Sequence, residues 1–193
     1  MKKIDLLQAN SRKLDHLLAE IVSENGATFS KICDLVSSTL EKNKTVFWCG
    51  NGGSAAESSH LAAELIGRFK SNRRPLSSIS LNSDIASITC IANDFGYEEI
   101  FSRQIEGLAK MGDVLIVLST SGLSQNICNA LIKSKELGVE TVAFLGKEGG
   151  IAKGLANHSI VVASSETARI QEIHLLLGHT LCEAIEINLG LSD

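Results

Sequence analysis

Proline and aromatic residues are scarce in this sequence. Among its 193 residues there is one proline, Pro75, and aromatic residues make up 4%. A chain of this kind, without long low-complexity segments, is neither collagen-like nor mostly disordered. Its apolar content of 44% and charged content of 21% are typical of globular proteins. We predict a single domain that spans residues 1–193, because domains commonly contain roughly 100–200 residues.

An excess of positive charge is also absent. Eighteen Lys and Arg residues face 22 Asp and Glu residues, which gives a net charge of −4, so we expect no nucleic-acid partner. The charged N-terminal segment lacks the apolar core of a signal peptide. The longest uncharged run, residues 114–132, is interrupted by the polar segments STSG and SQN, which argues against a membrane span. We therefore expect a cytoplasmic protein with no membrane partner.

The cysteines show no pattern of a metal or redox site. Their number is odd and no two have the CxxC spacing. Without an export signal, the sequence predicts free thiols, buried because all of them stand in apolar surroundings. They are Cys33, Cys49, Cys90, Cys128 and Cys182.

The first 42 residues have the apolar spacing of helices. A stripe of near-heptad spacing is followed by the polar segment 24–26, which predicts two helices with a break between them. We expect residues 1–42 to form an N-terminal extension that mediates oligomerisation, since such a stripe suits a helix partner. The stripe consists of Ile4, Leu7, Leu14, Leu18 and Ile21.

From residue 45 onward, short apolar segments alternate with amphipathic ones. The alternation favours a parallel sheet with helices on both faces, because the crossovers are right-handed. The predicted fold class is therefore α/β, a three-layer α-β-α sandwich around a five-stranded parallel sheet. We expect strands at 45–49, 77–80, 113–119, 140–145 and 159–162, and helices at 55–66, 85–92, 97–108, 124–137 and 168–189.

Two predicted strands end in loops rich in glycine and hydroxyl side chains. The first, NGGS, lets the backbone approach a ligand at Gly52 and Gly53, and Ser54 is expected to cap the next helix. The second is STSGLS at residues 119–124. Hydroxyls and helix N-terminal amides at the carboxyl ends of strands suit a phosphate monoester. Ordinary turns and caps are the alternative, and neither loop has a nucleotide-binding spacing.

Histidines and carboxylates gather on two predicted helices. His60 and Glu64 lie four residues apart and share a helix face, so they could hold a divalent metal, act as acid and base, or form a surface ion pair. Gln171 and His179 are about 12 Å apart along the last helix. That spacing suits one metal only if the ion lies between them or if different copies contribute. His174 is expected to be structural or to support a neighbouring site residue.

The sequence resembles the sugar isomerase (SIS) family and, within it, the phosphoheptose isomerases. The resemblance covers nearly the whole chain. It implies conversion of sedoheptulose 7-phosphate to D-glycero-D-manno-heptose 7-phosphate through an enediol, by a homotetramer with sites between subunits. The segments that carry the resemblance are CGNGGSAAESSHLAAELIGRF, IANDFGYEEIFSRQ, LSTSGLSQN and TARIQEIHLLLGHTLCEAIE.

The resemblance also assigns roles to individual residues. It implies Glu64 and His179 as catalytic base and acid. It implies one zinc ion on His60, Glu64, Gln171 and His179, with a weak or shifting Glu64 contact, since a tightly bound carboxylate is a poor base. Some members carry an acid where Ala168 stands, so a contact there is absent. The expected substrate-binding residues are Asn51, Gly52, Gly53, Ser54, Glu64, Arg68, Asn93, Asp94, Ser119, Thr120, Ser121, Ser124, Arg169 and Gln171.

Two other functions share this fold. One is a non-enzymatic SIS protein that binds the bacterial replication initiator, but that branch lacks the acid and the histidine found here at Glu64 and His179. The other is a regulatory module that senses a sugar phosphate and needs no metal ligands. A turnover assay separates the enzyme from both.

Overall fold

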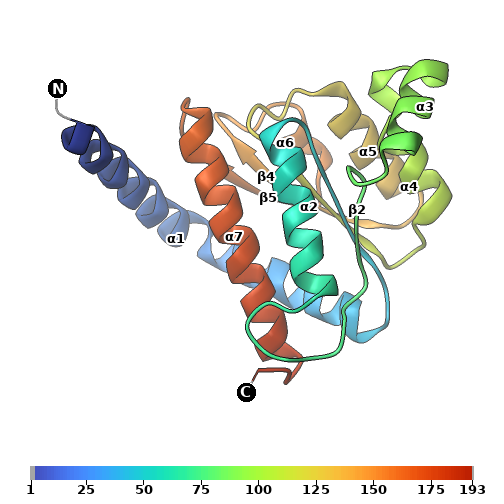
Figure 1. The fold of residues 1–193 in the computed structure, drawn as a ribbon, viewed down its shortest axis with the longest axis horizontal. Coiled ribbons are helices and arrows are strands. Elements are labelled where there is room, and N and C mark those ends of the chain that lie inside the picture. The colour runs from blue at the N-terminus through green and yellow to red at the C-terminus, as the bar shows by residue number, and fades with distance from the viewer. Residues whose placement is uncertain (1–2, 193) are drawn as a thin grey trace.

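The computed structural model describes residues 3–192 and has the predicted three-layer architecture (Figure 1). Its five parallel strands run in the order β2-β1-β3-β4-β5, and each begins and ends within one residue of its predicted bounds. The α/β prediction is thus confirmed. The strands are β1 (Val46–Gly50), β2 (Ser78–Ser80), β3 (Val114–Ser119), β4 (Glu140–Gly146) and β5 (His158–Val162).

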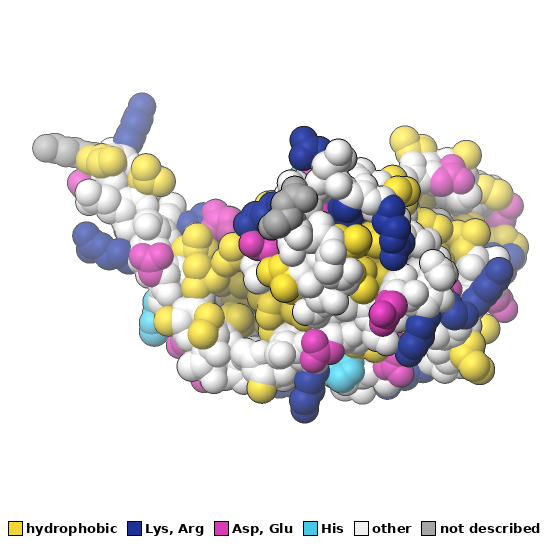
Figure 2. Space-filling model, turned by 90° about the horizontal axis from the view of Figure 1, so that it is seen from below, with side chains coloured by type: hydrophobic (Ala, Val, Ile, Leu, Met, Phe, Trp, Pro, Cys, Tyr) yellow, Lys and Arg dark blue, Asp and Glu magenta, His cyan; other side chains and the backbone are white. Residues whose placement is uncertain are grey.

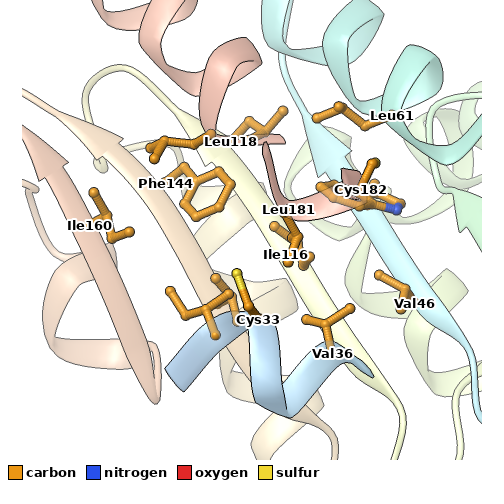
Figure 3. Close-up of a cluster of buried hydrophobic side chains, with 14 of the residues drawn as sticks. Cys33, Val36, Val46, Leu61, Ile116, Leu118, Phe144, Ile160, Leu181 and Cys182 are labelled. Atoms are coloured by element: carbon orange, nitrogen blue, oxygen red, sulfur yellow. The ribbon is translucent and has the colours of Figure 1, made fainter. Parts of the chain in front are cut away.

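Apolar side chains alternate between the two faces of this sheet. In β3, Ile116 and Leu118 point toward α1, α2 and α7, whereas Leu115 and Val117 point toward the opposite helices. Figure 3 shows the first of these two cores, in which the sheet meets side chains of three helices. The helices are α1 (Lys3–Glu41), α2 (Gly53–Ile66), α3 (Ile85–Phe95), α4 (Ser102–Leu108), α5 (Gln125–Glu136), α6 (Ala152–Leu155) and α7 (Thr167–Asn188).

One predicted helix is divided in the structure, and one short helix was not predicted. The segment 97–108 is not one helix: a 3-10 turn, η1 (Tyr97–Glu99), precedes α4. The turn lets the adjacent side chains of Ile100 and Phe101 both enter the core, where they are 2% and 0% exposed. The short helix α6 was not predicted, since four residues are too few to show a helical period.

The predicted break at residues 24–26 is also wrong, because α1 is a single helix of 39 residues. Gly26 lies within it and has no atom within 4 Å of the position a Cβ would take. One glycine costs a helix only about 1 kcal/mol. The packed stripe continues across it, from Ile21 before the glycine to Phe29 and Ile32 after it.

The N-terminal part of α1 projects from the body (Figure 1). Leu17 and Ile21 are buried against the core, whereas Ile4 and Leu7 are 54% and 66% exposed. Figure 2 shows this arm standing clear, with hydrophobic side chains upon it. None of the helices described, over residues 3–192, is long and apolar enough to cross a membrane.

The thiols are free, as predicted. Four of them are buried, and burial raises the pKa of Cys33 to about 11. Cys90 departs from the prediction because it is exposed. It lies on α3, a helix that has no buried residue despite its apolar sequence.

Candidate active site

The site lies where β1 and β3 are neighbours. The chain leaves β1 for α2 on one face of the sheet and leaves β3 for α5 on the other. Loops that diverge in this way open a crevice at the carboxyl ends of the strands. A pocket of about 250 Å³ occupies this place. Its lining residues are Asn51, Gly53, Ser54, Leu118, Ser119, Thr120, Ser121, Ser124, Thr167 and Gln171.

The first loop is shaped by its glycines. Gly52 has a φ of 60° and is the N-cap of α2, which begins at Gly53. Ser54 was predicted to be the N-cap, but it is a buried residue of the first turn. A Cβ on Gly53 would collide with the side-chain amide of Gln171. The absence of a side chain at Gly53 thus lets α7 bring Gln171 into the pocket.

The second loop, residues 119–124, folds through its own hydroxyls. The Ser119 hydroxyl accepts a hydrogen bond from the amide of Gly122 at 3.0 Å, and that of Ser121 accepts one from Leu123 at 3.2 Å. Ser124, predicted as the first residue of the helix, is the N-cap of α5, and its side chain makes no capping bond. Its hydroxyl is therefore available to a ligand, and the N-terminal end of α5, which favours anions, lies beside it.

The two loops are joined by a pair of amides. Asn51 and Asn126 exchange two side-chain hydrogen bonds of 2.9 Å, one in each direction. The Asn51 amide oxygen also accepts a bond from the Tyr97 hydroxyl at 3.0 Å. The side chain of Asn51, expected to contact substrate, is therefore engaged in holding the crevice together.

A second group of polar side chains lies farther along α2, at the place where this helix contacts α7. The Nε2 atoms of His60 and His179 are 2.8 Å apart, and the His60 Nε2 lies 3.4 Å from Glu64 Oε1. The ligand atoms of these residues all lie within 4.8 Å of one another. Two imidazole nitrogens and a carboxylate are donors that zinc prefers, so the residues fit such an ion. The side chain of His60 is 46% exposed, which leaves the group open on one side.

Gln171 lies at the pocket, and Arg169 precedes it by two residues on α7. Gln171 is two turns before His179 on α7 and lines the pocket beside Gly53. Arg169 donates to Glu172 at 2.6 Å, while its Nε is buried without a partner. Arg68 is exposed in the loop that follows α2.

Two predicted substrate residues do not line the pocket of this single chain. Asn93 and Asp94 are exposed on α3, and neither is among the described residues that line the crevice. The Asn93 amide donates to the Asp94 carboxylate at 2.8 Å. A role of these two residues in substrate binding stays a prediction.

Among the titratable groups near the site whose pKa values are altered are His174 and Glu57. His174 is fully buried, and its Nε2 donates to the carbonyl of Leu145 at 3.0 Å. Burial lowers its pKa to about 4 and so keeps it neutral, in agreement with a structural role. On α2, burial raises the pKa of Glu57 to about 7, an effect that a hydrogen bond from Ser54 partly offsets.

Besides the apolar Leu118 of β3, three residues of the crevice were not predicted. Asn126 and Tyr97 hold Asn51 in place, and Thr167 begins α7 at the edge of the pocket. Asn126 and Tyr97 stand within segments that the sequence already singled out, LSTSGLSQN and IANDFGYEEIFSRQ. Their contacts join segments 46 and 75 residues apart, which no local pattern reveals.

Comparison with known proteins adds the following. The model of the SIS domain family matches residues 11–146. The chain is 45% identical to a phosphoheptose isomerase of Nitratiruptor sp. over 184 residues, which cover 90% of this chain and 98% of the relative. It is 50% identical to a phosphoheptose isomerase of Helicobacter pylori over 152 residues, 79% of each chain. The structure of a phosphoheptose isomerase from Francisella tularensis superposes with a TM-score of 0.91 at 30% identity, covering 97% of this chain and 100% of that one.

Proposed function

The chain belongs to the SIS domain family and, within it, to the phosphoheptose isomerases, and from this premise we propose that it converts sedoheptulose 7-phosphate to D-glycero-D-manno-heptose 7-phosphate. The product would feed heptose synthesis. The observation that carries the proposal is that a hydroxyl-lined pocket and a His-Glu-His group lie along the same two helices, α2 and α7.

The pocket suits the phosphate group. It offers the hydroxyls of Ser119, Ser121 and Ser124 together with the N-terminal ends of α2 and α5. Amides at helix N-termini favour anions because the helix dipole is positive there. We assign the phosphate of the substrate to this pocket.

The His-Glu-His group suits the reacting end of the sugar. Along α2, His60 follows Ser54 by six residues, about 9 Å at 1.5 Å per residue. A seven-carbon sugar separates its phosphate from C1 and C2 by a distance of the same order. The substrate would thus lie along α2 with its carbonyl near His179 and Glu64.

Aldose–ketose isomerisation moves a proton between adjacent carbons. It needs a base at carbon and an acid at oxygen, each within hydrogen-bonding reach. We assign the base to Glu64, whose carboxylate is the one in the group, and the acid to His179. The roles reverse in the opposite direction of the reaction.

The same residues would hold a metal ion. His60, Glu64 and His179 supply the nitrogen and oxygen donors that zinc prefers. The side chain of Gln171 is the fourth ligand that we propose, with the ion between it and His179 or with different copies of the chain contributing. A bound zinc ion polarises carbonyl and hydroxyl oxygens. The residues of the chain orient the sugar and move the proton. A homotetramer and a cytoplasmic location stay predictions.

The direct test is turnover of the proposed substrate. Purified protein is incubated with sedoheptulose 7-phosphate, and the anomeric signals of the product are followed by NMR. We expect an aldose 7-phosphate that approaches a constant ratio to the ketose. Binding of the ketose without any aldose would instead favour a sensing module and contradict the proposal.

A further inference from the structure

A buried ion pair joins the two helices that carry the His-Glu-His group. Arg73 follows α2 in the chain, and Glu186 is on α7. The Nε of Arg73 and Oε1 of Glu186 are 2.8 Å apart, and the two side chains are 1% and 2% exposed. Each other ion pair found over residues 3–192 has at least one partner that is more than a fifth exposed.

The carboxylate of Glu186 binds the backbone of the loop that follows α2. It accepts hydrogen bonds from the amides of Phe69, Lys70 and Ser71 at 3.1–3.2 Å. Burial opposes ionisation of Glu186, but these amides and Arg73 outweigh it and hold the pKa of the carboxyl below its usual value. Three successive amides on one carboxylate fix the path of the loop over α7.

The guanidinium of Arg73 binds the end of α2. It donates to the carbonyls of Glu64 and Leu65 at 2.9 and 2.8 Å. These are carbonyls of the last turn, which have no partner within the helix. Arg73 thus connects the turn that carries Glu64 to Glu186, and through it to α7.

The loop held in this way places an aromatic ring on His179. The rings of Phe69 and His179 are stacked, with centroids 5.5 Å apart and an interplanar angle of 26°. Across the group, the His60 ring meets His179 edge-on at 77°. The Phe69 ring therefore limits rotation of the His179 imidazole, whose Nε2 points at His60.

We propose that Arg73 and Glu186 are positioning residues for the isomerase reaction, and that they act by holding Phe69 against His179. A buried ion pair is seldom worth more to stability than apolar residues of the same size. Here the pair fixes the position of the loop relative to α2 and α7, because Arg73 binds backbone carbonyls of α2 and Glu186 binds backbone amides of the loop. Misplacing a catalytic group by about 1 Å can cost roughly a hundredfold in rate.

The test compares two carboxylates of the same helix. Glu186→Gln removes the buried charge, and Glu183→Gln makes the same change one turn earlier, where the carboxylate binds Lys70 at 2.6 Å on the surface. Phe69→Leu removes the ring. We expect E186Q and F69L to lower kcat roughly ten- to a hundredfold with KM within about twofold, and E183Q to leave kcat within about twofold.

The double variant separates positioning from general loss of structure. If Glu186 acts through Phe69, E186Q together with F69L is scarcely slower than the slower single variant, since both remove the same interaction. The proposal would be overturned if the reduction of kcat in the double variant equalled the product of the two single reductions. A folded E186Q variant with the kcat of the unchanged protein would overturn it as well. If E186Q does not fold, Arg73→Lys takes its place. It keeps the charge but cannot reach both α2 carbonyls, and wild-type kcat in R73K would overturn the proposal equally.

A readout without substrate keeps this inference distinct from the proposed function on which it rests. In protein labelled at histidine, the Phe69 ring shifts the His179 ring protons upfield. F69L should abolish that shift and E186Q should reduce it, while E183Q preserves it. Absence of turnover by the unchanged protein would refute the function alone. An F69L variant with unaltered His179 signals would refute the positioning by Phe69 alone.

Discussion

His174 is a buried histidine that folding keeps neutral. Its pKa falls from 6.5 to about 4 because burial disfavours the charged form. The unfolded chain therefore binds a proton between these pH values that the folded chain does not bind. The stability that depends on neutral His174 is complete above about pH 6.5 and is lost as the pH falls toward 4. This contribution is on the order of 3 kcal/mol, since a tenfold change in a proton-binding constant corresponds to about 1.4 kcal/mol.

His174→Leu should remove this loss. Urea unfolding at pH 6.5 and 4.5 measures it, and the variant should lose less free energy of unfolding between the two values than the unchanged protein. His16→Leu, which removes an exposed histidine, is the control. It should lose as much free energy of unfolding between the two pH values as the unchanged protein does. An equal loss in all three proteins would contradict the burial argument.

Glu57 has the opposite effect on stability. Burial raises its pKa from 4.5 to about 7, so the folded chain binds a proton in this interval that the unfolded chain has released. Its contribution to stability is complete below about pH 4.5 and is lost as the pH rises through 7.

Glu57→Gln should therefore raise Tm at pH 8 and leave it nearly unchanged at pH 4.5. The increase is a few degrees at most, because the side chain is only half-buried and solvent screens its charge. The same change at the exposed Glu148 should leave Tm nearly unchanged at both pH values. A lower Tm for the Glu57 variant at pH 8 would show that the carboxylate itself is required there.

At the scale of elements, the distance between α2 and α7 depends on a glycine. A Cβ on Gly178 would lie 3.0 Å from Leu61 Cγ and closer still to its methyl groups. Both residues are buried. Gly178→Ala should therefore force the helices apart and destabilise the protein by about 1–3 kcal/mol.

The matched control is Gly26→Ala, also in the middle of a helix. No atom lies near the added methyl group there, so this variant should be more stable, by about 0.5–1 kcal/mol. Thermal unfolding of both variants checks that Tm falls for Gly178→Ala and rises for Gly26→Ala. Equal Tm changes would mean that the contact of α2 with α7 adapts without cost.

The elements could be predicted where the local pattern matched the packing. Val114–Leu118 is continuously apolar, and its strand is covered on both faces. The break expected at 24–26 was wrong because tertiary packing on both sides of Gly26 outweighs the helix propensity of one glycine. The turn at 97–99 was missed because it depends on two adjacent side chains that the core accepts together.

The sequence predicts which site residues share a face of one helix, but not which residues from different helices meet. The spacing of His60 and Glu64 places them on one face, and the structure adds His179 from a helix more than a hundred residues later. Asn93 and Asp94 came from the resemblance alone, and they are not among the residues that line the pocket. No local pattern could reveal that Arg73 and Glu186 meet, since 113 residues separate them.

At the scale of the whole molecule, the arm of α1 bears exposed apolar residues that suit a partner helix. Ile4 and Leu7 are 54% and 66% exposed at its projecting end. We expect a tetramer by light scattering at micromolar concentration, and Ile4→Ser with Leu7→Ser should shift it toward smaller species without unfolding. A fully active monomer would contradict the expectation and show that one chain holds a complete site.

The central claim is that the chain is an isomerase with Glu64 as its base. The most direct test is reaction with sedoheptulose 7-phosphate in D₂O, followed by NMR. The unchanged protein should yield an aldose 7-phosphate with deuterium at C2, and Glu64→Gln should lower both turnover and exchange by a factor of roughly 100 to 10,000. His179→Ala should slow turnover yet could retain some exchange, since the base remains. Near-normal turnover and exchange by the Glu64→Gln variant would contradict the account.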